Sequence, residues 1–388
     1  MMKINLSEPF FFGKEYKNVK KTLTRKWISA SGKTTKEFEK KLSQYLSIKN
    51  ILGLINCTSA LQLSIKLLRP ENKDEIIVPS ITFVASINAV IYNNCKPIFI
   101  DCDQNLLLDT KKVVKFLNEQ TFMKNGFCYN KKTKKRILGV ILVHTFGNLV
   151  NIDKKFIFEC KKKNIKIIED AAESLGSYYK KNFPNSHAGS IGNFGCLSFN
   201  GNKIVTSGGG GAILFKKKQD LIRCRYLASQ AKDDKNFFIH NEVGYNYLIS
   251  DLHSAIGLSQ MLKLNKVIKK KYLINNIYKK NINKIPGLKI LTSPSYCKSN
   301  YWLNILLVDE KVYGISKKKI IHNFSRRNIE TRSVWYPNHL QKPFKKFQSY
   351  QITKSFKLYD KALCLPSSYN LSKKNQFKII QLLKNKFK

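Results

Sequence analysis

The sequence predicts an α/β protein in which a mostly parallel sheet is covered by helices on both faces. Short apolar runs rich in Ile, Val and Leu alternate along the first half of the chain with stretches that have helical spacing. Within these runs apolar and polar residues do not alternate, which is typical of strands buried on both faces of a parallel sheet. At 388 residues and 43% hydrophobic content, the chain can form a large α/β domain and a smaller second domain.

The predicted elements follow one another along the first half of the chain. Residues 33–48 place Phe38, Leu42 and Leu46 at helical spacing with lysines opposite, which predicts an amphipathic helix. The basic insert 121–136 is expected to form a hairpin or loop on the surface. The other expected elements are strands at 50–56, 75–80, 96–103, 137–144 and 165–172, and helices at 59–68 and 84–93.

The second half of the chain has a different character, which predicts a second domain. Residues 245–282 are expected to be largely helical, and residues 301–388 to combine a strand at 301–308 with helices. The expected division is a large domain of residues 1–258 and a small C-terminal α/β domain of residues 259–388.

The charge of the chain is strongly positive, with a formal net charge of +45 from 70 lysines and arginines. Only eight of these residues are arginine, although arginine binds phosphates and base edges bidentately. The lysines are spread along the whole chain, so we expect attraction of small anionic substrates and no nucleic-acid partner. A basic nucleic-acid-binding protein is the alternative of a different class.

The sequence also predicts where the protein works. No apolar run is long enough to cross a membrane, and the N-terminus lacks the features of a signal peptide. Nine cysteines occur without C-x-x-C spacing, which argues against a disulfide framework and a structural zinc site. We therefore expect a cytoplasmic protein with no membrane partner and no metal.

Polar side chains gather where the predicted strands end. Open α/β sheets bind ligands at the carboxyl ends of their strands. These ends hold a carboxylate, an aromatic ring, hydroxyls and a lysine. The five ends are residues 56–60, 79–83, 143–148, 169–174 and 198–203.

Asp170 and Lys203 are the candidate catalytic pair. A carboxylate at a strand end can hold a pyridinium proton, and a lysine opposite it can bind pyridoxal phosphate (PLP) covalently. The stretch "NCTSAL", residues 56–61, places small and hydroxyl residues at the start of a helix, whose free N–H groups favour a phosphate. The alternatives are that Asp170 caps a helix and that Lys203 is one more solvated lysine. The position of Lys203 between a strand end and the glycines 208–211 argues against the latter.

Seven motifs follow one another along the chain: "NCTSALQLSIKLL", "VHTFGN", "IIEDAAESLGS", "SFNGNKIVTSGGGGAIL", "GYNYLISDLHSAIGLSQM", "YWLN" and "TRSVWYPNHLQ". In this order and spacing, they resemble the motifs of the PLP-dependent sugar aminotransferases of the DegT/DnrJ/StrS type, and the resemblance extends over nearly the whole chain. It implies fold type I, with a seven-stranded, mostly parallel sheet in the large domain.

The resemblance also implies a role for each residue around the cofactor. Lys203 would bind PLP covalently and then move the proton, and Asp170 would pair with the pyridine nitrogen. Glu173 would lie near the 3′-oxygen of PLP, although an exposed acid in the first turn of a helix is the alternative. The remaining cofactor-binding residues would be Thr58, Ser59 and Ser198 at the phosphate and Phe83 against the ring. Many members of the family have glycine and some have alanine where Cys57 stands, so a small side chain is expected to be tolerated.

Further residues are implied at the substrate and across a dimer. Asn246, in "GYNY", would reach the PLP phosphate of the neighbouring subunit, which implies a homodimer with shared active sites. His144, at a strand end, is expected to be structural rather than a substrate contact. The substrate-binding residues would be Trp27, Ser29, Tyr336 and His339.

The implied reaction transfers an amino group, from L-glutamate, to a 4-keto-6-deoxy nucleotide sugar for surface-glycan synthesis. The motifs "SFNGNKIVTSGGGG" and "YWLN" and the basic insert are most similar to the branch that acts on UDP-4-keto-6-deoxy-N-acetylglucosamine. An aminotransferase for GDP-linked or 3-keto sugars would share every cofactor residue. The sugar dehydratases of the family have histidine in place of the lysine, and Lys203 argues against that class.

Overall fold

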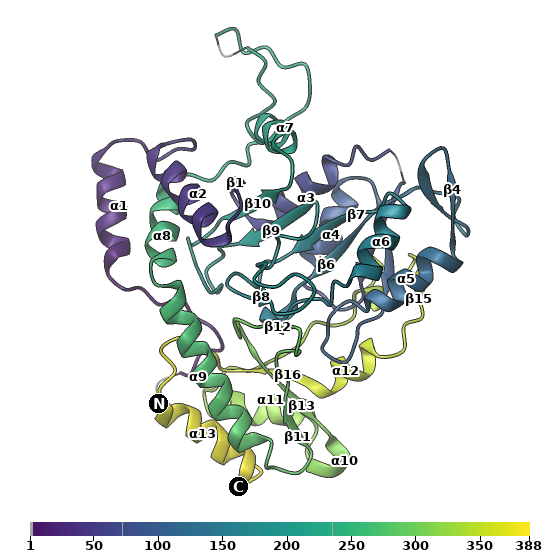
Figure 1. Ribbon diagram of the computed structural model, residues 1–388. Helices are drawn as coiled ribbons and strands as arrows, with labels where there is room; N and C mark the ends of the chain where they lie inside the picture. Colours follow the sequence, from purple (N-terminus) through teal and green to yellow (C-terminus); the bar gives the residue numbers. More distant parts are fainter. Residues whose placement is uncertain (1–2, 72, 235) are drawn as a thin grey trace.

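The large sheet of the protein has eight strands in the order β1-β10-β9-β7-β6-β2-β3-β15 (Figure 1). The structure is a computed structural model that describes residues 3–71, 73–234 and 236–388. In sheet order, the strands are β1 (Asn50–Leu54), β10 (Gly211–Phe215), β9 (Phe194–Ser198), β7 (Lys166–Asp170), β6 (Ile137–Val143), β2 (Glu75–Pro79), β3 (Lys96–Ile100) and β15 (Ser349–Tyr350).

Within the run β9-β7-β6-β2-β3-β15, each pair of adjacent strands is parallel. The strand β10 is antiparallel to both of its neighbours, β1 and β9. The prediction of a mostly parallel sheet is confirmed. An eighth, two-residue strand extends the expected seven, because Ser349 and Tyr350 pair with Phe99 and Ile100 at the sheet edge.

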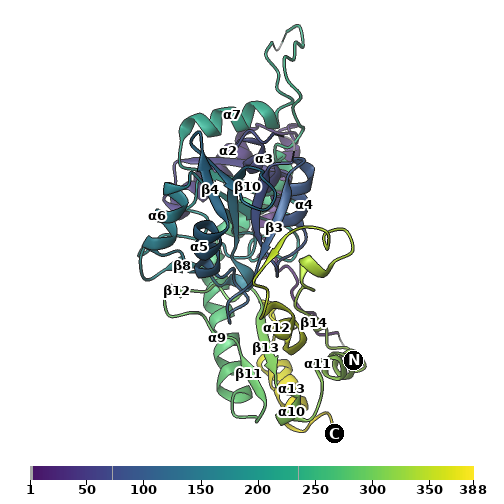
Figure 2. The same ribbon diagram turned by 90° about the vertical axis from the view of Figure 1, so that its right-hand side faces the viewer.

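Helices cover both faces of this sheet, as predicted, and Figure 2 shows the two layers of helices with the sheet between them. Buried side chains of α2, α5 and α6 pack on one face, and those of α3, α4 and α7 pack on the other. Asn56, Asp109 and Asp153 cap the starts of α3, α5 and α6, each accepting backbone N–H groups of the first turn. The helices are α2 (Lys33–Leu46), α3 (Cys57–Lys66), α4 (Ala85–Tyr92), α5 (Thr110–Glu119), α6 (Lys154–Lys162) and α7 (Lys218–Ala228).

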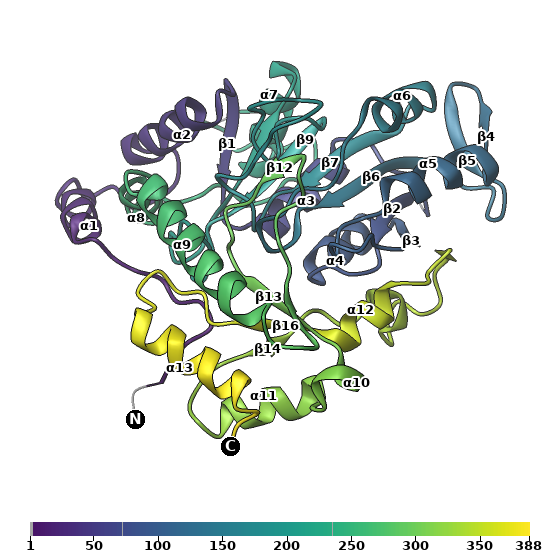
Figure 3. The same ribbon diagram turned by 60° about the horizontal axis from the view of Figure 1, so that its bottom comes forward.

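A second, antiparallel sheet in the order β11-β13-β16-β14 lies below the first (Figure 3). Side chains of α9, α11 and α13 pack with its strands in a separate apolar cluster. These elements are β11 (Leu288–Ile290), β13 (Asn304–Val308), β16 (Ala362–Leu365), β14 (Arg332–Ser333), α9 (Leu264–Ile282), α10 (Glu310–Tyr313), α11 (Lys317–Ser325), α12 (Ser355–Lys361) and α13 (Lys373–Lys384).

Two segments cross the expected division at residue 258. Ile4 pairs with Ile329 and is buried in the cluster of the second sheet, whereas β15 joins the first sheet. The division into residues 1–258 and 259–388 stays a prediction.

The remaining elements include the predicted hairpin in the basic insert, formed by β4 and β5. Gly32 precedes α2 and has no side chain with which to cap it, so Asp251 of α8 accepts the N–H groups of Thr34 (3.2 Å) and Thr35 (2.9 Å). None of the helices in the described residues is long and apolar enough to span a bilayer. These elements are α1 (Lys14–Thr24), α8 (Asp251–Met261), β4 (Thr121–Lys124), β5 (Phe127–Asn130), β8 (Tyr178–Tyr179) and β12 (Cys297–Lys298).

Candidate active site

A cavity of about 430 Å³ opens at the carboxyl ends of the parallel strands. All five of the predicted strand ends contribute side chains to its wall. The other wall comes from residues 302–303, 332–335 and 364 of the second sheet and its flanking loops. This is the position that an open parallel sheet offers to a ligand.

Lys203 projects its amine into this cavity. Its Nζ atom lies 3.4 Å from Glu173 Oε1 and 4.0 Å from the centre of the Trp302 ring. Only 13% of its side chain is exposed, so Lys203 is not one more solvated lysine.

Asp170 ends β7 and lies on the same cavity, 5% exposed. Its carboxylate accepts hydrogen bonds from Ser86 Oγ (2.6 Å) and the Ala172 N–H (3.1 Å). Burial raises the pKa of Asp170, and these two hydrogen bonds and the charge of Lys203 oppose that rise. A cationic group bound in the cavity would therefore stabilise the ionised form of Asp170.

Asp170 does not cap a helix, because no helix follows it. The Ala171 N–H continues the sheet by donating to Cys196 O of β9 (2.8 Å). The chain then turns, and the Ser174 N–H donates to Ala171 O (3.0 Å). The expectation that the alanines after Asp170 begin a helix is wrong.

Glu173 is buried at 6% exposure beside Lys203 rather than exposed on a helix. It accepts a hydrogen bond from the Phe146 N–H (2.7 Å). Burial raises the pKa of Glu173 to about 7, although Lys203 and the Phe146 N–H both lower it. The carboxyl group can therefore exchange a proton near neutral pH.

The start of α3 forms a second wall of the cavity. Asn56 accepts the Ser59 N–H at 2.8 Å, and Cys57 and Thr58 face the cavity. The first N–H groups of a helix have no partner within the helix, so they favour an anion here. Ser198 lines the cavity from the end of β9, whereas Ser59 is buried and does not line it.

The glycine run after Lys203 packs behind the cavity rather than beside the amine. Residues 208–211 do not line the cavity. A Cβ on Gly211 would lie 2.5 Å from the backbone carbon of Asn56 and 2.6 Å from Cys57 N. Gly208 and Gly210 have positive φ angles of 79° and 129°. Gly211 therefore lets β10 pass against the start of α3, and Gly208 and Gly210 supply the left-handed backbone of the turn before it.

We expect Gly211→Ala to displace the start of α3, because backbone atoms cannot move aside as a side chain can. The free energy of unfolding should fall by about 1–3 kcal/mol, and PLP should be retained less well. Gly209→Ala is the matched control, since its Cβ would meet only ordinary contacts at 3.6 Å and beyond. Denaturant unfolding and PLP content measure both effects, and equal behaviour of the two variants would contradict this role of Gly211.

Aromatic side chains form much of the remaining wall. Phe83 lines the cavity at 57% exposure, as a ring available to a ligand. Phe146 and Trp335 stack with centroids 4.5 Å apart and planes 9° apart. Trp302 lies under Lys203.

Sequence reasoning did not single out Trp302, Arg332, Trp335 or Phe146. Each lies inside a quoted motif, and Arg332 is the one arginine that the cavity lining includes. Arg332 extends from β14 and pairs with Glu330 at 3.1 and 2.6 Å. In "TRSVWYP" the resemblance favoured Tyr336, which does not line the cavity.

The other predicted site residues lie outside the cavity of this single chain. Trp27 (54% exposed) and Ser29 lie between α1 and α2, and Asn246 is exposed and pairs with Ser229. Tyr336 is 39% exposed. His339 Nδ1 lies 2.9 Å from Ser80 Oγ.

His144 and Glu169 form a buried pair behind the site. The Val150 N–H donates to His144 Nδ1 (3.1 Å), so His144 Nε2 carries the proton and donates to Glu169 (2.8 Å). Glu169 also accepts the N–H groups of Gly189 (3.1 Å) and Ile191 (2.7 Å). The pair therefore holds residues 189–192 against the sheet and leaves Asp170 as the carboxylate of β7 in the cavity.

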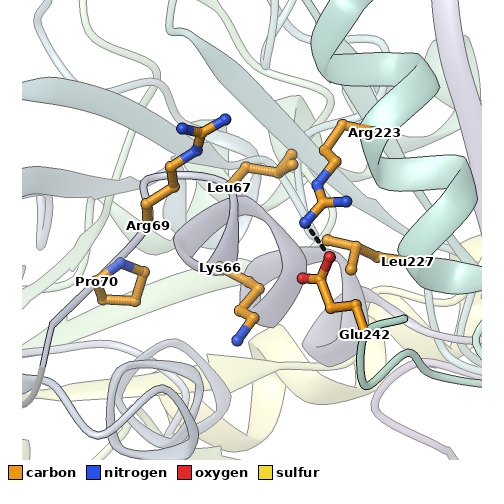
Figure 4. A pocket seen from close by; sticks show the side chains of 7 residues that line it. All are labelled: Lys66, Leu67, Arg69, Pro70, Arg223, Leu227 and Glu242. Atoms are coloured by element: carbon orange, nitrogen blue, oxygen red, sulfur yellow. Dashed lines mark hydrogen bonds and ion pairs between the residues drawn. The ribbon is translucent and has the colours of Figure 1, made fainter. Parts of the chain in front are cut away.

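A second hollow lies between the C-terminal end of α3 and α7 (Figure 4). Arg223 and Glu242 form an ion pair across it. It contains none of the predicted site residues. Its lining residues are Lys66, Leu67, Arg69, Pro70, Arg223, Leu227 and Glu242.

The donor set of the main cavity fits pyridoxal phosphate. A buried carboxylate suits a pyridinium nitrogen, a helix start suits a phosphate, and a lysine amine suits an aldehyde. A cavity with these groups at the carboxyl ends of a mostly parallel sheet defines a PLP-dependent aminotransferase of fold type I.

Comparison with known proteins identifies the family. The chain belongs to the DegT/DnrJ/EryC1/StrS aminotransferase family, whose sequence profile matches residues 12–384. It is a PLP-dependent sugar aminotransferase, as the sequence predicted.

Individual relatives cover nearly the whole chain. A putative pyridoxal phosphate-dependent aminotransferase, EpsN of Bacillus subtilis, is 31% identical over 99% of this chain and 96% of its own. GDP-perosamine synthase of Escherichia coli O157:H7 is 29% identical over 96% of this chain and 95% of its own. A Campylobacter jejuni UDP-4-amino-4,6-dideoxy-N-acetyl-beta-L-altrosamine transaminase is 29% identical over 80% of this chain and 78% of its own.

The fold also matches a solved structure. The aminotransferase PseC of Helicobacter pylori superposes with a TM-score of 0.87 at 23% identity, covering 100% of this chain and 99% of its own. At this identity the match shows the fold alone, and it agrees with the predicted fold type I.

Proposed function

We propose that the enzyme transfers an amino group from L-glutamate to the 4-keto carbon of a UDP-linked 4-keto-6-deoxy-N-acetylhexosamine. The amino transfer is supported by one observation: the amine of Lys203 lies beside Glu173 in the cavity that Asp170 also lines. The Campylobacter relative, named a UDP-linked 4-amino-4,6-dideoxy sugar transaminase, supports the choice of nucleotide and the position of the amine. The net charge of +45 favours an anionic nucleotide sugar.

A GDP-linked sugar is the second candidate. GDP-perosamine synthases of three bacteria are 27–29% identical to this chain and cover 87–96% of it, more than the Campylobacter relative covers. The cofactor residues would be the same for both substrates.

Each cavity residue then has a task. PLP supplies a ring that accepts electrons from the bond being broken. Asp170 would keep a proton on the pyridine nitrogen, and Lys203 would hold the cofactor and move the proton at the reacting carbon. Thr58 and Ser198 on the cavity wall, and Ser59 buried in the first turn of α3, would bind the phosphate. Phe83 would stack on the ring, and Glu173 would lie near the 3′-oxygen.

A substrate screen tests this proposal. We expect the purified enzyme with PLP and L-glutamate to convert the UDP-linked 4-keto-6-deoxy sugar to a 4-amino sugar, with the product read by mass spectrometry. The GDP-linked 4-keto sugar and a 3-keto nucleotide sugar are the competing substrates. Faster conversion of either one would assign the enzyme to that substrate and overturn the UDP proposal.

We further propose that the active site is shared across a homodimer. Asn246, Trp27 and Ser29 are exposed and do not line the cavity of their own chain. The segment after α7 extends away from the rest of the chain (Figure 1), with its base held by the ion pair between Arg223 and Glu242. Its exposed apolar residues suit burial against a second copy. They are Phe237, Phe238, Ile239 and Val243, 50–82% exposed.

Mixing two impaired variants tests the shared site. We expect Lys203→Ala and Asn246→Ala homodimers to be inactive or severely impaired. In a mixed dimer one site loses both residues and the other keeps both, so subunit exchange should restore up to about half of the activity per mixed dimer. Absence of recovery, with exchange demonstrated by native mass spectrometry, would mean that Asn246 serves its own chain.

The cytoplasm is the proposed compartment. All nine cysteines are buried and none forms a disulfide, which suits a reducing environment.

A further inference from the structure

Trp302 makes contacts that the proposed function does not use. It is 4% exposed, and the centre of its ring lies 4.0 Å from Lys203 Nζ. An aromatic face stabilises an ammonium at this distance, more so when water is excluded. Lys203 therefore has two attractive neighbours, the indole face and the Glu173 carboxylate at 3.4 Å.

The indole is itself held to the loop that carries Lys203. Trp302 Nε1 donates to the carbonyl of Asn202, the residue before Lys203, at 2.8 Å. One side chain therefore contacts both the backbone of the loop and the amine at its end. The ring that contacts the amine is therefore itself fixed to the backbone beside Lys203.

The backbone of Trp302 is held from two further directions. Its N–H donates to Asn300 Oδ1 (2.8 Å), and the amide of Asn300 donates to Glu173 O (2.9 Å). Its carbonyl accepts from Nζ of the buried Lys271 (3.0 Å). The Trp302 ring, Lys203 and Glu173 thus belong to one connected group of contacts that joins the two sheets.

We propose that Trp302 is a positioning residue that holds the free amine of Lys203 over its indole face, beside Glu173. The inference rests on the proposed role of Lys203. The contact matters in the part of the reaction in which Lys203 is not bound to the cofactor and must stay within reach of the reacting carbon to move its proton. A lysine without this contact has four rotatable bonds and spends less time in that position.

The experiment uses Trp302→Leu, which keeps apolar bulk but removes the aromatic face, and Trp302→Phe, which keeps a face but removes the N–H. In cofactor-free protein, Lys203 is labelled with acetic anhydride over a range of pH, and the modified fraction is read by mass spectrometry. Because the ring favours the charged amine, half-maximal labelling in Trp302→Leu should move to lower pH, by about 0.5–1 unit. Trp302→Phe should stay within about 0.3 unit of the wild type.

Kinetics of the loaded enzyme give a second readout. We expect kcat to fall about tenfold in Trp302→Leu with KM changed less than about twofold, and to fall less than about threefold in Trp302→Phe. Phe324→Leu is the matched control, because Phe324 is fully buried in the cluster of the second sheet and contacts neither Lys203 nor the cavity. This control should lose stability but keep both the labelling profile and kcat.

Two results would overturn the inference. An unchanged labelling profile and kcat in Trp302→Leu would show that the ring does not position Lys203. Equal losses in the Leu and Phe variants would mean that the N–H bond to Asn202 matters and the ring face does not. Failure of the proposed function is distinguishable, because borohydride would then fix PLP to a lysine other than Lys203 in the wild-type protein.

Discussion

Lys203→Ala is expected to lower kcat by at least about 10⁴-fold, because one side chain both holds the cofactor and moves the proton. In free energy this is about 5.5 kcal/mol of lost transition-state stabilisation. The measurement is single-turnover conversion of enzyme-bound PLP by L-glutamate. Lys203→Arg should be equally inactive, since a guanidinium keeps the charge but cannot form the bond.

Lys216→Ala is the matched control for this loss. Lys216 is an exposed lysine just beyond β10, so its removal changes the net charge of the chain equally without reaching the cavity. A Lys203→Ala enzyme within tenfold of the Lys216→Ala control would contradict the assignment of Lys203.

Asp170→Asn is expected to slow the half-reaction with L-glutamate by about 10³-fold, or about 4 kcal/mol. The substitution keeps most of the shape but removes the charge that holds the proton on the pyridine nitrogen. Because the Asn oxygen can accept the Ala172 N–H and its amide group can donate to the Ser86 hydroxyl, which accepts as well as donates, the fold should be largely preserved. Stopped-flow absorbance of the bound cofactor follows the rate, and circular dichroism follows the fold.

Glu169→Gln, one position before Asp170, is expected to lower the stability of the fold rather than the rate of the reaction. Burial tends to raise the pKa of Glu169, but His144 and the N–H groups of residues 189–192 outweigh it, so the pKa is lowered overall. A lowered pKa in the folded state means that ionised Glu169 stabilises the fold above its ordinary pKa and less so as the pH falls below it. Glu169→Gln should therefore lose stability at neutral pH while Asp170→Asn loses rate. If instead Glu169→Gln lowered the rate and Asp170→Asn lowered only the stability, Asp170 would have a purely structural role.

Much of the fold follows from local patterns in the sequence. The apolar runs that become β1, β2, β3, β6 and β7 are buried on both faces, so a short continuous run was sufficient to predict them. The strand β15 could not be predicted in this way. It has two residues, and pairing with β3 rather than its own side-chain pattern determines its conformation.

The candidate site likewise has residues that local sequence could predict and residues that it could not. Asp170, Thr58, Phe83, Ser198 and Lys203 come from strand ends, where topology alone brings distant residues together. Which of two adjacent acids faces the cavity depends on strand alternation and on the loop 189–192 that binds Glu169.

The aromatic residues of the loops that flank the second sheet were missed because nothing local marks them. Trp302 and Trp335 reach the cavity only through the packing of the two sheets, and a buried aromatic residue in a sequence looks the same in either role. The glycines 208–211 stood out, but the atoms that Gly211 makes room for belong to Asn56 and Cys57, some 150 residues earlier in the chain.

Borohydride trapping of the bound cofactor is the direct test of Lys203 as the lysine that binds PLP. The PLP-loaded wild-type protein is reduced, digested and mapped by mass spectrometry. Lys271 is an informative competitor, because its buried Nζ donates to the carbonyl of Trp302 behind the cavity and burial lowers its pKa to about 7. We expect the label on Lys203, and a label on Lys271 or on any other lysine would overturn the assignment of Lys203.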